Sequence, residues 1–527
     1  MTTRQATTHS AWAVARGIVL IVAGAGVLWS VFRAASALLA GSAAWPTLFD
    51  AAAHVVGTAL GAGILYLLLH PQVWAIARNT MAQAIRIRAA FAIMALYLAL
   101  VCALPFVVEG DGTLRGLLHV LIGYSLIAAG VLLGILTLAL STTILWSEIH
   151  EKQIFILESK PVARWQILLG KLLGILAVDA GLLAFMALVT WGSVQVHARR
   201  SRWDDIERRL AREQVLTARR VARPDAEDLS KEVDRAYEEL KRRGQLPSGA
   251  PADVRDQLRD ELRNLRNAIR PRARRHWRFS GLRGARRDKG NFTLRFKFST
   301  SSRTREKPLF TGWEVGARGT RDFARYQATY PPDEVNEVQL PARLITPEGV
   351  LDVYLYNFDP GNLTLIFTGD DAVEALVPVA GFASNLARGL WLILVEVLFL
   401  AILGLCCSTF MSFPVSPVVA LALYVLIYLA GTVKAEMDQG LTLIEGTKES
   451  KVAAAVETAM RGIATTVRFV LPPFDRYTAS EPVSFGEEVS SKHVLEATLS
   501  IALLRGGVLV LLGILIFERR ELALASR

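Results

Sequence analysis

The sequence predicts a mainly α-helical polytopic membrane protein with an extracytoplasmic α+β insert, a helical hairpin followed by a β-sandwich. Hydrophobic residues make up 52% of the 527 residues, charged residues make up only 20%, and the mean hydropathy is +0.35. The apolar residues lie in long uncharged runs such as LLHVLIGYSLIAAGVLLGILTLAL. A helix of about 20 apolar residues spans a bilayer. A purely soluble enzyme is therefore excluded.

Eight apolar runs are long enough to be membrane spans. They are residues 17–40, 53–75, 90–108, 117–146, 168–196, 386–411, 415–433 and 496–517. The three cysteines all lie in apolar runs, and three cannot staple a chain of this length, so a secreted disulfide scaffold is also excluded.

Charged flanks predict the orientation of these spans. Arg78, Arg86 and Arg88 form a basic elbow without acidic residues, and the C-terminal tail is also basic, so both are expected on the cytoplasmic side. The acidic loop 109–113 is expected outside. Alternation then places both termini in the cytoplasm, as in a multi-pass protein of the plasma (inner) membrane.

Four regions follow from this assignment. Residues 1–89 hold two extra N-terminal spans and the elbow, 90–196 hold spans joined by segment 147–167, 197–385 form the extracytoplasmic domain, and 386–527 hold the C-terminal spans with an outer amphipathic region, 434–493. Within that outer region, helical periodicity over 451–471 predicts an interfacial or re-entrant helix.

The insert accounts for most of the net charge of +11, because residues 197–381 contain 36 Lys and Arg against 28 Asp and Glu. Opposite charges at helical spacing predict a helical hairpin over 201–275, and alternating apolar residues with Gly, Pro and Asp turns predict a β-sandwich over 277–377. A recognition helix, zinc finger or RNP pattern is missing, which argues against nucleic-acid binding. The densest basic patch, 270–287, is interpreted as a solvated surface or as a contact for anionic headgroups or an acidic partner.

Segment 147–174 combines charged and apolar residues between two spans. Lys160 precedes Pro161, which disfavours helix at that point, so a short helix is expected to end there and another to begin. A short surface helix joined to two spans can transmit a push from a cytoplasmic partner, although an ordinary interfacial loop would also fit the pattern.

The stretch LESKPVARWQILLGKLLG, residues 157–174, resembles the cytoplasmic coupling segment of ABC-2-type exporter permeases. The pattern of that family is Leu-Leu-Ser-Arg/Lys-Pro-Val-Ser-Arg followed by Gly-Lys, and here Glu158 and Ala163 depart from it. The stretches LPPFDRY, 471–477, and ILIFERREL, 514–522, also resemble the family. The resemblance covers the six spans from residue 90 onward but not the first two, and the insert is unusually large.

The resemblance implies one half of a dimeric permease, paired with itself or with a sister subunit, and a separate cytoplasmic ABC ATPase docked on the coupling segment 147–167. The residues expected to couple to that ATPase are Glu148, Glu151, Ser159, Lys160, Pro161, Arg164 and Lys171. The chain itself lacks a phosphate-binding loop, because Leu172 follows Gly170-Lys171 where Ser or Thr is required. We therefore expect a transport subunit rather than an enzyme, without a cofactor.

Three ionisable residues, Asp179, Glu396 and Arg505, lie inside predicted spans, where charge is costly. Glu396 and Arg505 both fall near the middle of the bilayer, so we expect them to pair, either to fix helix register or to serve the substrate path or gating. The sequence contains neither H-E-x-x-H nor G-x-S-x-G and has no histidines at metal-binding spacing. The alternative function is a membrane-anchored binding or scaffold protein that acts through the β-sandwich.

Overall fold

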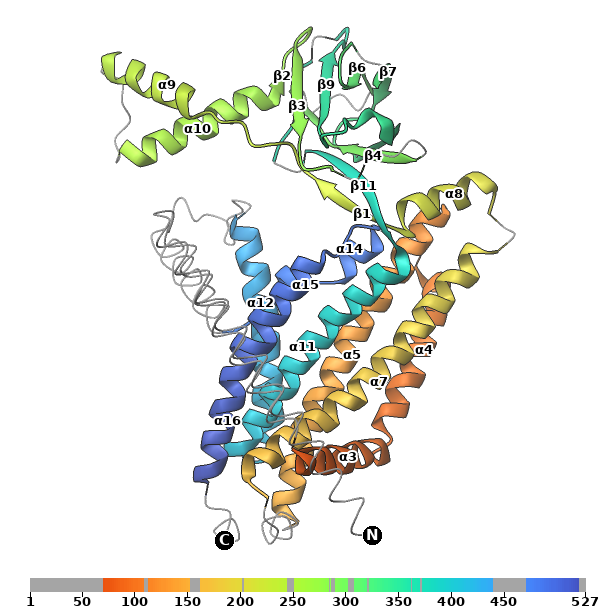
Figure 1. The fold of residues 1–527 in the computed structure, drawn as a ribbon, viewed down its shortest axis with the longest axis vertical. Helices are drawn as coiled ribbons and strands as arrows, with labels where there is room; N and C mark the ends of the chain where they lie inside the picture. The colour runs from red at the N-terminus through yellow and green to blue at the C-terminus, as the bar shows by residue number, and fades with distance from the viewer. Residues whose placement is uncertain are drawn as a thin grey trace. The chain divides into compact units, whose positions relative to one another are not determined.

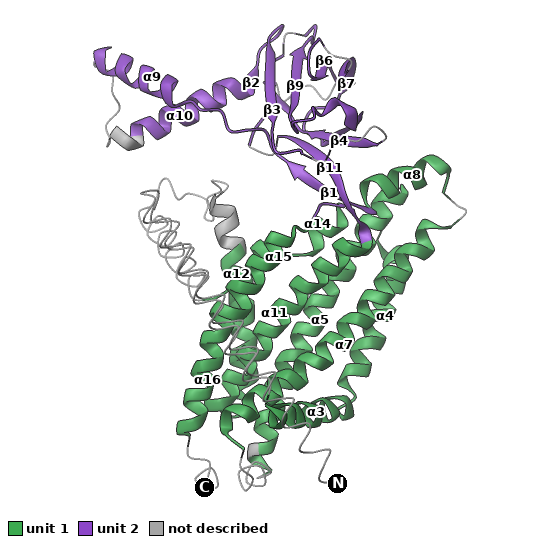
Figure 2. Cartoon of the chain, viewed as in Figure 1, with its two compact units in different colours: residues 1–215, 383–485, 489–527 green, residues 216–382, 486–488 purple. Residues whose placement is uncertain are grey.

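The chain forms two compact units, coloured separately in Figure 2. Unit 1 comprises Met1–Val215, Ala383–Phe485 and Val489–Arg527, and unit 2 comprises Leu216–Phe382 and Gly486–Glu488. The computed structural model describes residues 70–108, 112–151, 162–200, 203–243, 251–283, 285, 290–301, 308–319, 322–361, 363–369, 372–438 and 471–520.

Unit 1 is built from helices (Figure 1). They are α3 (Pro71–Arg86), α4 (Ala89–Val107), α5 (Leu114–His150), α7 (Arg164–Ala198), α8 (Asp205–Gln214), α11 (Phe382–Phe410), α12 (Val415–Asp438), the 3-10 turn η2 (Phe474–Tyr477), α14 (Ser480–Ser484), α15 (Ser491–Ala497), the π-helix η3 (Thr498–Gly506) and α16 (Gly507–Arg519). Helix α7 packs against α3, α4, α5 and α16, and α5 also packs against α12 and α14.

Among the described residues, five helices are long and apolar enough to cross a membrane. They cover Ala89–Val107, Leu114–Glu148, Arg164–Ala198, Phe382–Phe410 and Ser491–Arg519, and a shorter apolar helix covers Val415–Gly431. These six helices correspond in order to the last six predicted spans. Unit 1 therefore contains the helices that are suited to cross a membrane.

The predicted N-terminal spans fall mostly outside the described residues, which begin at residue 70. The predicted end of the second span at residue 75 is corrected, because His70 has an extended backbone and α3 starts as a separate helix at Pro71. Proline favours this first helical position, where its missing N–H leaves no intrahelical hydrogen bond unmade. The predicted interfacial helix over 451–471 lies outside the described residues apart from residue 471.

Burial separates one central helix from the others in unit 1. In α11, 72% of the most apolar 18-residue window is buried within the protein, against 17% in α4. The exposed apolar side chains include Phe106 of α4, Val418 of α12 and Val508 of α16. A bilayer would cover such side chains, and α11 is the most buried of the five long apolar helices.

Unit 2 contains three antiparallel sheets (Figure 1). Their strand orders are β1-β11-β4-β8, β2-β10-β5 and β3-β9-β6-β7. The strands are β1 (Thr217–Ala222), β2 (Ala268–Ile269), β3 (Arg274–Phe279), β4 (Asn291–Phe296), β5 (Ser299–Thr300), β6 (Leu309–Gly316), β7 (Phe323–Tyr330), β8 (Asn336–Pro341), β9 (Leu351–Asn357), β10 (Leu365–Ile366) and β11 (Val373–Gly381), with a 3-10 turn, η1 (Ala342–Leu344), after β8.

The three sheets share one apolar core, to which Ile269, Trp277, Phe292, Trp313 and Leu365 contribute. The predicted alternation is confirmed in β9, where residues 351, 353 and 355 are fully buried and residues 352, 354 and 356 are partly exposed. Inward-facing residues of separate sheets thus close a single hydrophobic interior, which explains why this unit is compact.

The predicted hairpin over 201–275 is corrected in extent. Only α9 (Ser230–Arg243) and α10 (Pro251–Asn267) form it, around a small core that includes Val233, Tyr237 and Leu258. Residues 205–214 instead form α8, which belongs to unit 1.

Strand β1 lies where the hairpin was expected, because it pairs with β11 and also contacts residues 486–488, both distant in sequence. The backbone N–H of Arg219 donates to the carbonyl of Gly486 at 2.8 Å, and the N–H of Glu488 donates to the carbonyl of Arg219 at 2.8 Å. The guanidinium of Arg220 also binds the Glu488 carboxylate at 2.8 Å. Residues 486–488 therefore complete the sheet that contains β1.

Candidate functional site

Two of the predicted coupling residues meet as a buried ion pair. The Nζ atom of Lys171 in α7 lies 2.7 Å from Oε2 of Glu148 at the end of α5, and Lys171 is fully buried. A charge removed from water is tolerated only beside an opposite charge. The pair therefore fixes the end of α5 to the start of α7, on both sides of the segment that connects them.

Arg164, at the first position of α7, binds the end of α16. One terminal nitrogen of its guanidinium donates to the carbonyl oxygens of Phe517 (2.9 Å), Glu518 (3.1 Å) and Arg520 (2.8 Å). The last carbonyls of a helix have no intrahelical partners and carry partial negative charge, so a guanidinium is well matched to them. Arg164 thus caps α16 from α7.

Arg520 makes the same kind of contact with α11. Its guanidinium donates to the carbonyl of Thr409 at 2.7 Å and to that of Ser408 at 3.4 Å. Arg164 and Arg520 consequently join the start of α7, the end of α16 and the end of α11. The structure thus brings Arg164, from the stretch 157–174, to residues 517–520 of the stretch 514–522.

Helix α3 packs very closely on the same part of α7. A Cβ atom at Gly170 would lie 2.7 Å from the Ile76 side chain, and one at Gly174 would lie 2.6 Å from the carbonyl oxygen of Ala77. Small residues four apart allow two helices to approach in this way. Lys171 lies between these two glycines, so α3, α5 and α7 meet at the ion pair.

The remaining predicted coupling residues are only partly covered by the structure. Glu151 is exposed one residue beyond the end of α5, whereas Ser159, Lys160 and Pro161 lie outside the described residues. The expected end of a short helix near Lys160 stays a prediction. The second helix does not begin at Pro161 as expected, because Ala163 has an extended backbone and α7 starts at Arg164.

Glu396 of α11 lies at a cavity inside the helical unit. Its Oε1 accepts hydrogen bonds from the hydroxyls of Tyr428 (2.6 Å) and Tyr424 (3.3 Å), both in α12. The cavity has a volume of about 360 Å³ and is bordered by α5, α11, α12 and residues 478–480. Its walls are mainly apolar, and Glu396 is the only ionisable carboxyl group among the residues that line it.

The expected pairing of Glu396 with Arg505 is corrected. Within the described part of the chain, no ion pair joins them, and Arg505 instead donates to the hydroxyl (2.5 Å) and carbonyl (3.2 Å) of Ser500. Both arginine contacts lie within the π-helix η3, Thr498–Gly506. Similar depth in the membrane does not determine which way a side chain faces around its helix.

Asp179 is fully buried in α7 and faces α5. The hydroxyl of Thr137 donates to its Oδ2 at 3.0 Å, while its Oδ1 has no hydrogen-bond partner among the described residues. Asp179 therefore forms a second polar link between α5 and α7, separate from the Glu148–Lys171 pair.

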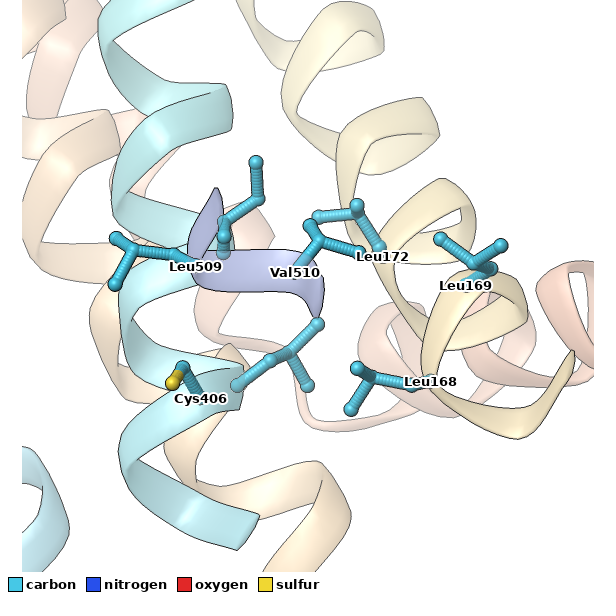
Figure 3. A pocket seen from close by; sticks show the side chains of 8 residues that line it. Leu168, Leu169, Leu172, Cys406, Leu509 and Val510 are labelled. Carbon is cyan, nitrogen blue, oxygen red and sulfur yellow. The ribbon is translucent and has the colours of Figure 1, made fainter. Parts of the chain in front are cut away.

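A second, very small pocket lies among α7, α11 and α16 (Figure 3). Its volume is about 10 Å³, and apolar side chains such as Leu168, Leu172 and Leu509 line it. This is about the space of one water molecule, and an apolar gap of that size stays dry. It is a packing gap rather than a ligand site.

Comparisons of this chain with models of protein families, with curated proteins and with solved structures find no match. Among the described residues, no group of three or more His, Cys, Asp or Glu side chains is placed to hold a metal ion.

Sequence reasoning missed Tyr424, Tyr428 and Arg520 as members of these sites. The two tyrosines are four residues apart on one apolar helix, and such spacing places both on one face. This spacing could have predicted that both tyrosine hydroxyls face the same neighbouring helix. Nothing local marks Arg520 as the partner of α11, because its contacts are more than 100 residues away in sequence.

Proposed function

We propose that the chain is the membrane-spanning permease subunit of an ABC transporter of the ABC-2 type, driven by a separate cytoplasmic ATPase. The observation that carries this proposal is the contact of Arg164 with the end of α16. It links the segment that resembles a coupling element to a helix far away in sequence. A resemblance in sequence thus coincides with a mechanical connection in the helical unit.

The contacts suggest how a push would spread. An ATPase bound to residues 147–167 would displace the start of α7, which is tied to α5 by the Glu148–Lys171 pair and to α16 by Arg164. Arg520 would extend the displacement to α11. Packed helices respond as rigid bodies, so a small shift at one end is carried along their length.

The cavity beside Glu396 is the proposed part of the substrate path. Its apolar walls suit an amphipathic molecule, and the Glu396 carboxylate with the two tyrosine hydroxyls provides polar contacts for a cationic or hydrogen-bonding group. On this proposal, the protein is a plasma-membrane exporter with both termini in the cytoplasm, and two permeases, identical or related, form the complete path.

Site-directed crosslinking tests the proposed partner. In membranes of the native host, a cysteine replacing Lys160 is expected to crosslink to an ATPase that also co-purifies with the tagged chain. A cysteine replacing Arg199, at the other end of α7, is the matched control and is expected not to crosslink. Crosslinking from Arg199 but not from Lys160 would contradict the proposed orientation and coupling.

Arg164→Ala tests the mechanical connection. The variant is expected to keep ATP hydrolysis by the bound ATPase but to lose the nucleotide-dependent change in distance between spin labels at the exposed positions 515 of α16 and 418 of α12. Arg519→Ala also removes one positive charge next to the end of α16, but from an exposed side chain of α16 itself. That control is expected to retain the distance change.

A membrane-anchored binding protein is the second candidate, and it is favoured by the separate hydrophobic core of unit 2. In that case the helices serve only as an anchor, and no ATPase accompanies the chain. The absence of an ATPase from both pull-downs and crosslinks would support this function over transport.

A further inference from the structure

The sheet β3-β9-β6-β7 has an aromatic outer face. Trp277, Val353 and Trp313 of this sheet point into the core of unit 2, so the alternate residues of the same strands point outward. The outer face of an antiparallel sheet is normally polar. Here it carries the rings of His276, Phe310, Tyr354, Tyr356 and the adjoining Phe358.

Tyr354 lies at the centre of a stacked group on this face. The His276 ring stacks on it at 4.3 Å between centroids, and the guanidinium carbon of Arg318 lies 3.9 Å from its ring centroid. Arg318 also donates to Glu314 (2.6 Å) and to the Tyr356 hydroxyl (2.7 Å). These side chains are held in place before any ligand arrives, which lowers the entropy cost of binding.

Two phenylalanines extend the face beside this group. Phe310 and Phe358 remain 37% and 42% exposed, and their ring centroids are 6.5 Å apart. The Phe358 ring lies directly over Gly312, because a Cβ atom at that glycine would collide with the ring. Glycine at this position therefore leaves room for the Phe358 ring next to the sheet, where the ring stays accessible.

Two exposed arginines lie beside these rings. Arg274 and Arg278 lie two residues to either side of His276 on β3, and both are exposed. In the described part of the chain, neither guanidinium has an ion-pair or hydrogen-bond partner, although Asp352 lies opposite Arg278 in the register. At about 3.3 Å per residue the two positions are about 13 Å apart along the strand. Guanidinium groups so placed suit successive anionic groups of an extended polymer.

We propose that this outer face binds a linear anionic polysaccharide. The exposed rings of Phe310 and Phe358 would pack against the faces of the sugar rings, and Arg274 and Arg278 would bind carboxylates along the chain. An acidic peptide added as a strand at the β3 edge fits less well, because the carbonyl of Arg278 already accepts the N–H of Asp225 at 2.7 Å. This inference does not depend on the proposed transport function.

Binding of polygalacturonate oligosaccharides to the full-length protein in detergent tests the proposal. The double variant Arg274→Ala/Arg278→Ala is expected to bind at least about tenfold more weakly, which corresponds to about 1.4 kcal/mol. Arg235→Ala/Arg263→Ala removes the same charge from exposed positions of α9 and α10 and is expected to bind like the unmodified protein. Phe310→Thr, a residue suited to strands, tests the aromatic contribution and is also expected to weaken binding.

The probes distinguish the alternatives. Neutral dextran is expected not to bind, and polyglutamate is expected to bind more weakly than polygalacturonate. Equal binding of dextran would overturn the role of charge, and tighter binding of polyglutamate would assign the face to an acidic protein. Undetectable polygalacturonate binding, or equal losses in both arginine double variants, would also overturn the proposal. Circular dichroism and thermal unfolding verify that each variant is folded.

Discussion

Lys171 and Glu148 form an ion pair that is almost completely removed from solvent, with side chains 0% and 6% exposed. The same turn of α7 carries Gly170 and Gly174, on which α3 packs without room for a Cβ atom. This stretch of α7 is therefore fixed on one side by charge and on another by close backbone contact. Two different physical interactions hold the region next to the connecting segment.

Lys171→Met is expected to destabilise the protein by about 3–5 kcal/mol, because it leaves the Glu148 carboxylate buried without a counter-charge. The double variant Glu148→Gln/Lys171→Met removes both charges and is expected to recover most of that loss. Thermal unfolding in detergent measures the difference. If the double variant is as unstable as the single one, the contribution comes from packing of the Lys171 side chain rather than from the ion pair.

Gly174→Ala is expected to lower stability by about 1–3 kcal/mol, since the new methyl group would meet the Ala77 carbonyl oxygen at 2.6 Å and push α3 away. Gly181→Ala is the matched control in the same helix, because a Cβ atom there meets nothing within 4 Å. Thermal unfolding and hydrogen exchange over residues 71–86 report the effect. Equal stability of the two variants would mean that α3 adjusts without cost.

Much of the fold is local enough to be predicted from the sequence. Six helical spans follow from the length and hydropathy of their runs, and the faces of β9 follow from the alternation of Leu351, Val353 and Leu355 with polar residues. These signals depend on neighbours along the chain and on a single solvent boundary. These helices and this strand can therefore be predicted without knowing any contact between residues distant in sequence.

The errors arise where distant contacts decide the structure. Arg219 and Arg220 fall in the stretch that was expected to form a helical hairpin, yet pairing with β11 and contacts with residues 486–488 place them in a strand. Glu396 and Arg505 were expected to pair from their depth alone. The direction in which each side chain points around its helix depends on other features. Glu396 faces α12, and Arg505 lies in a π-helix, and neither feature can be read from the apolar runs.

Tyr428→Phe is expected to cost about 1.5–3 kcal/mol, because it removes the 2.6 Å hydrogen bond to the buried Glu396 carboxyl group. Tyr424→Phe removes a longer bond of 3.3 Å from the same oxygen and is expected to cost less. Thermal unfolding measures both variants. Because each variant loses one hydroxyl group from α12, the difference between them reports the strength of the two hydrogen bonds. A larger effect at Tyr424 would indicate that the observed bond lengths do not rank these contacts.

The carboxyl group of Glu314 is expected to make the stability of unit 2 depend on pH. Burial raises the pKa of this carboxyl group, but hydrogen bonds from Arg325, Arg318 and Tyr356 outweigh that effect and leave the pKa below its usual value. A lowered folded-state pKa means that the stabilisation is fully present above the unfolded-state pKa of about 4.3. This stabilisation is lost as the pH falls through the folded-state pKa of Glu314.

We therefore expect protection from hydrogen exchange in β6, after correction for intrinsic exchange rates, to fall as the pH drops below about 4.3. Glu314→Gln is expected to show lower protection at neutral pH and a flatter dependence on pH, because the amide cannot titrate. Glu334→Gln replaces an exposed carboxylate of the same unit and is expected to keep the pH dependence of the unmodified protein. If Glu314→Gln retained the full loss of protection in acid, another carboxyl group of unit 2 would have to carry it.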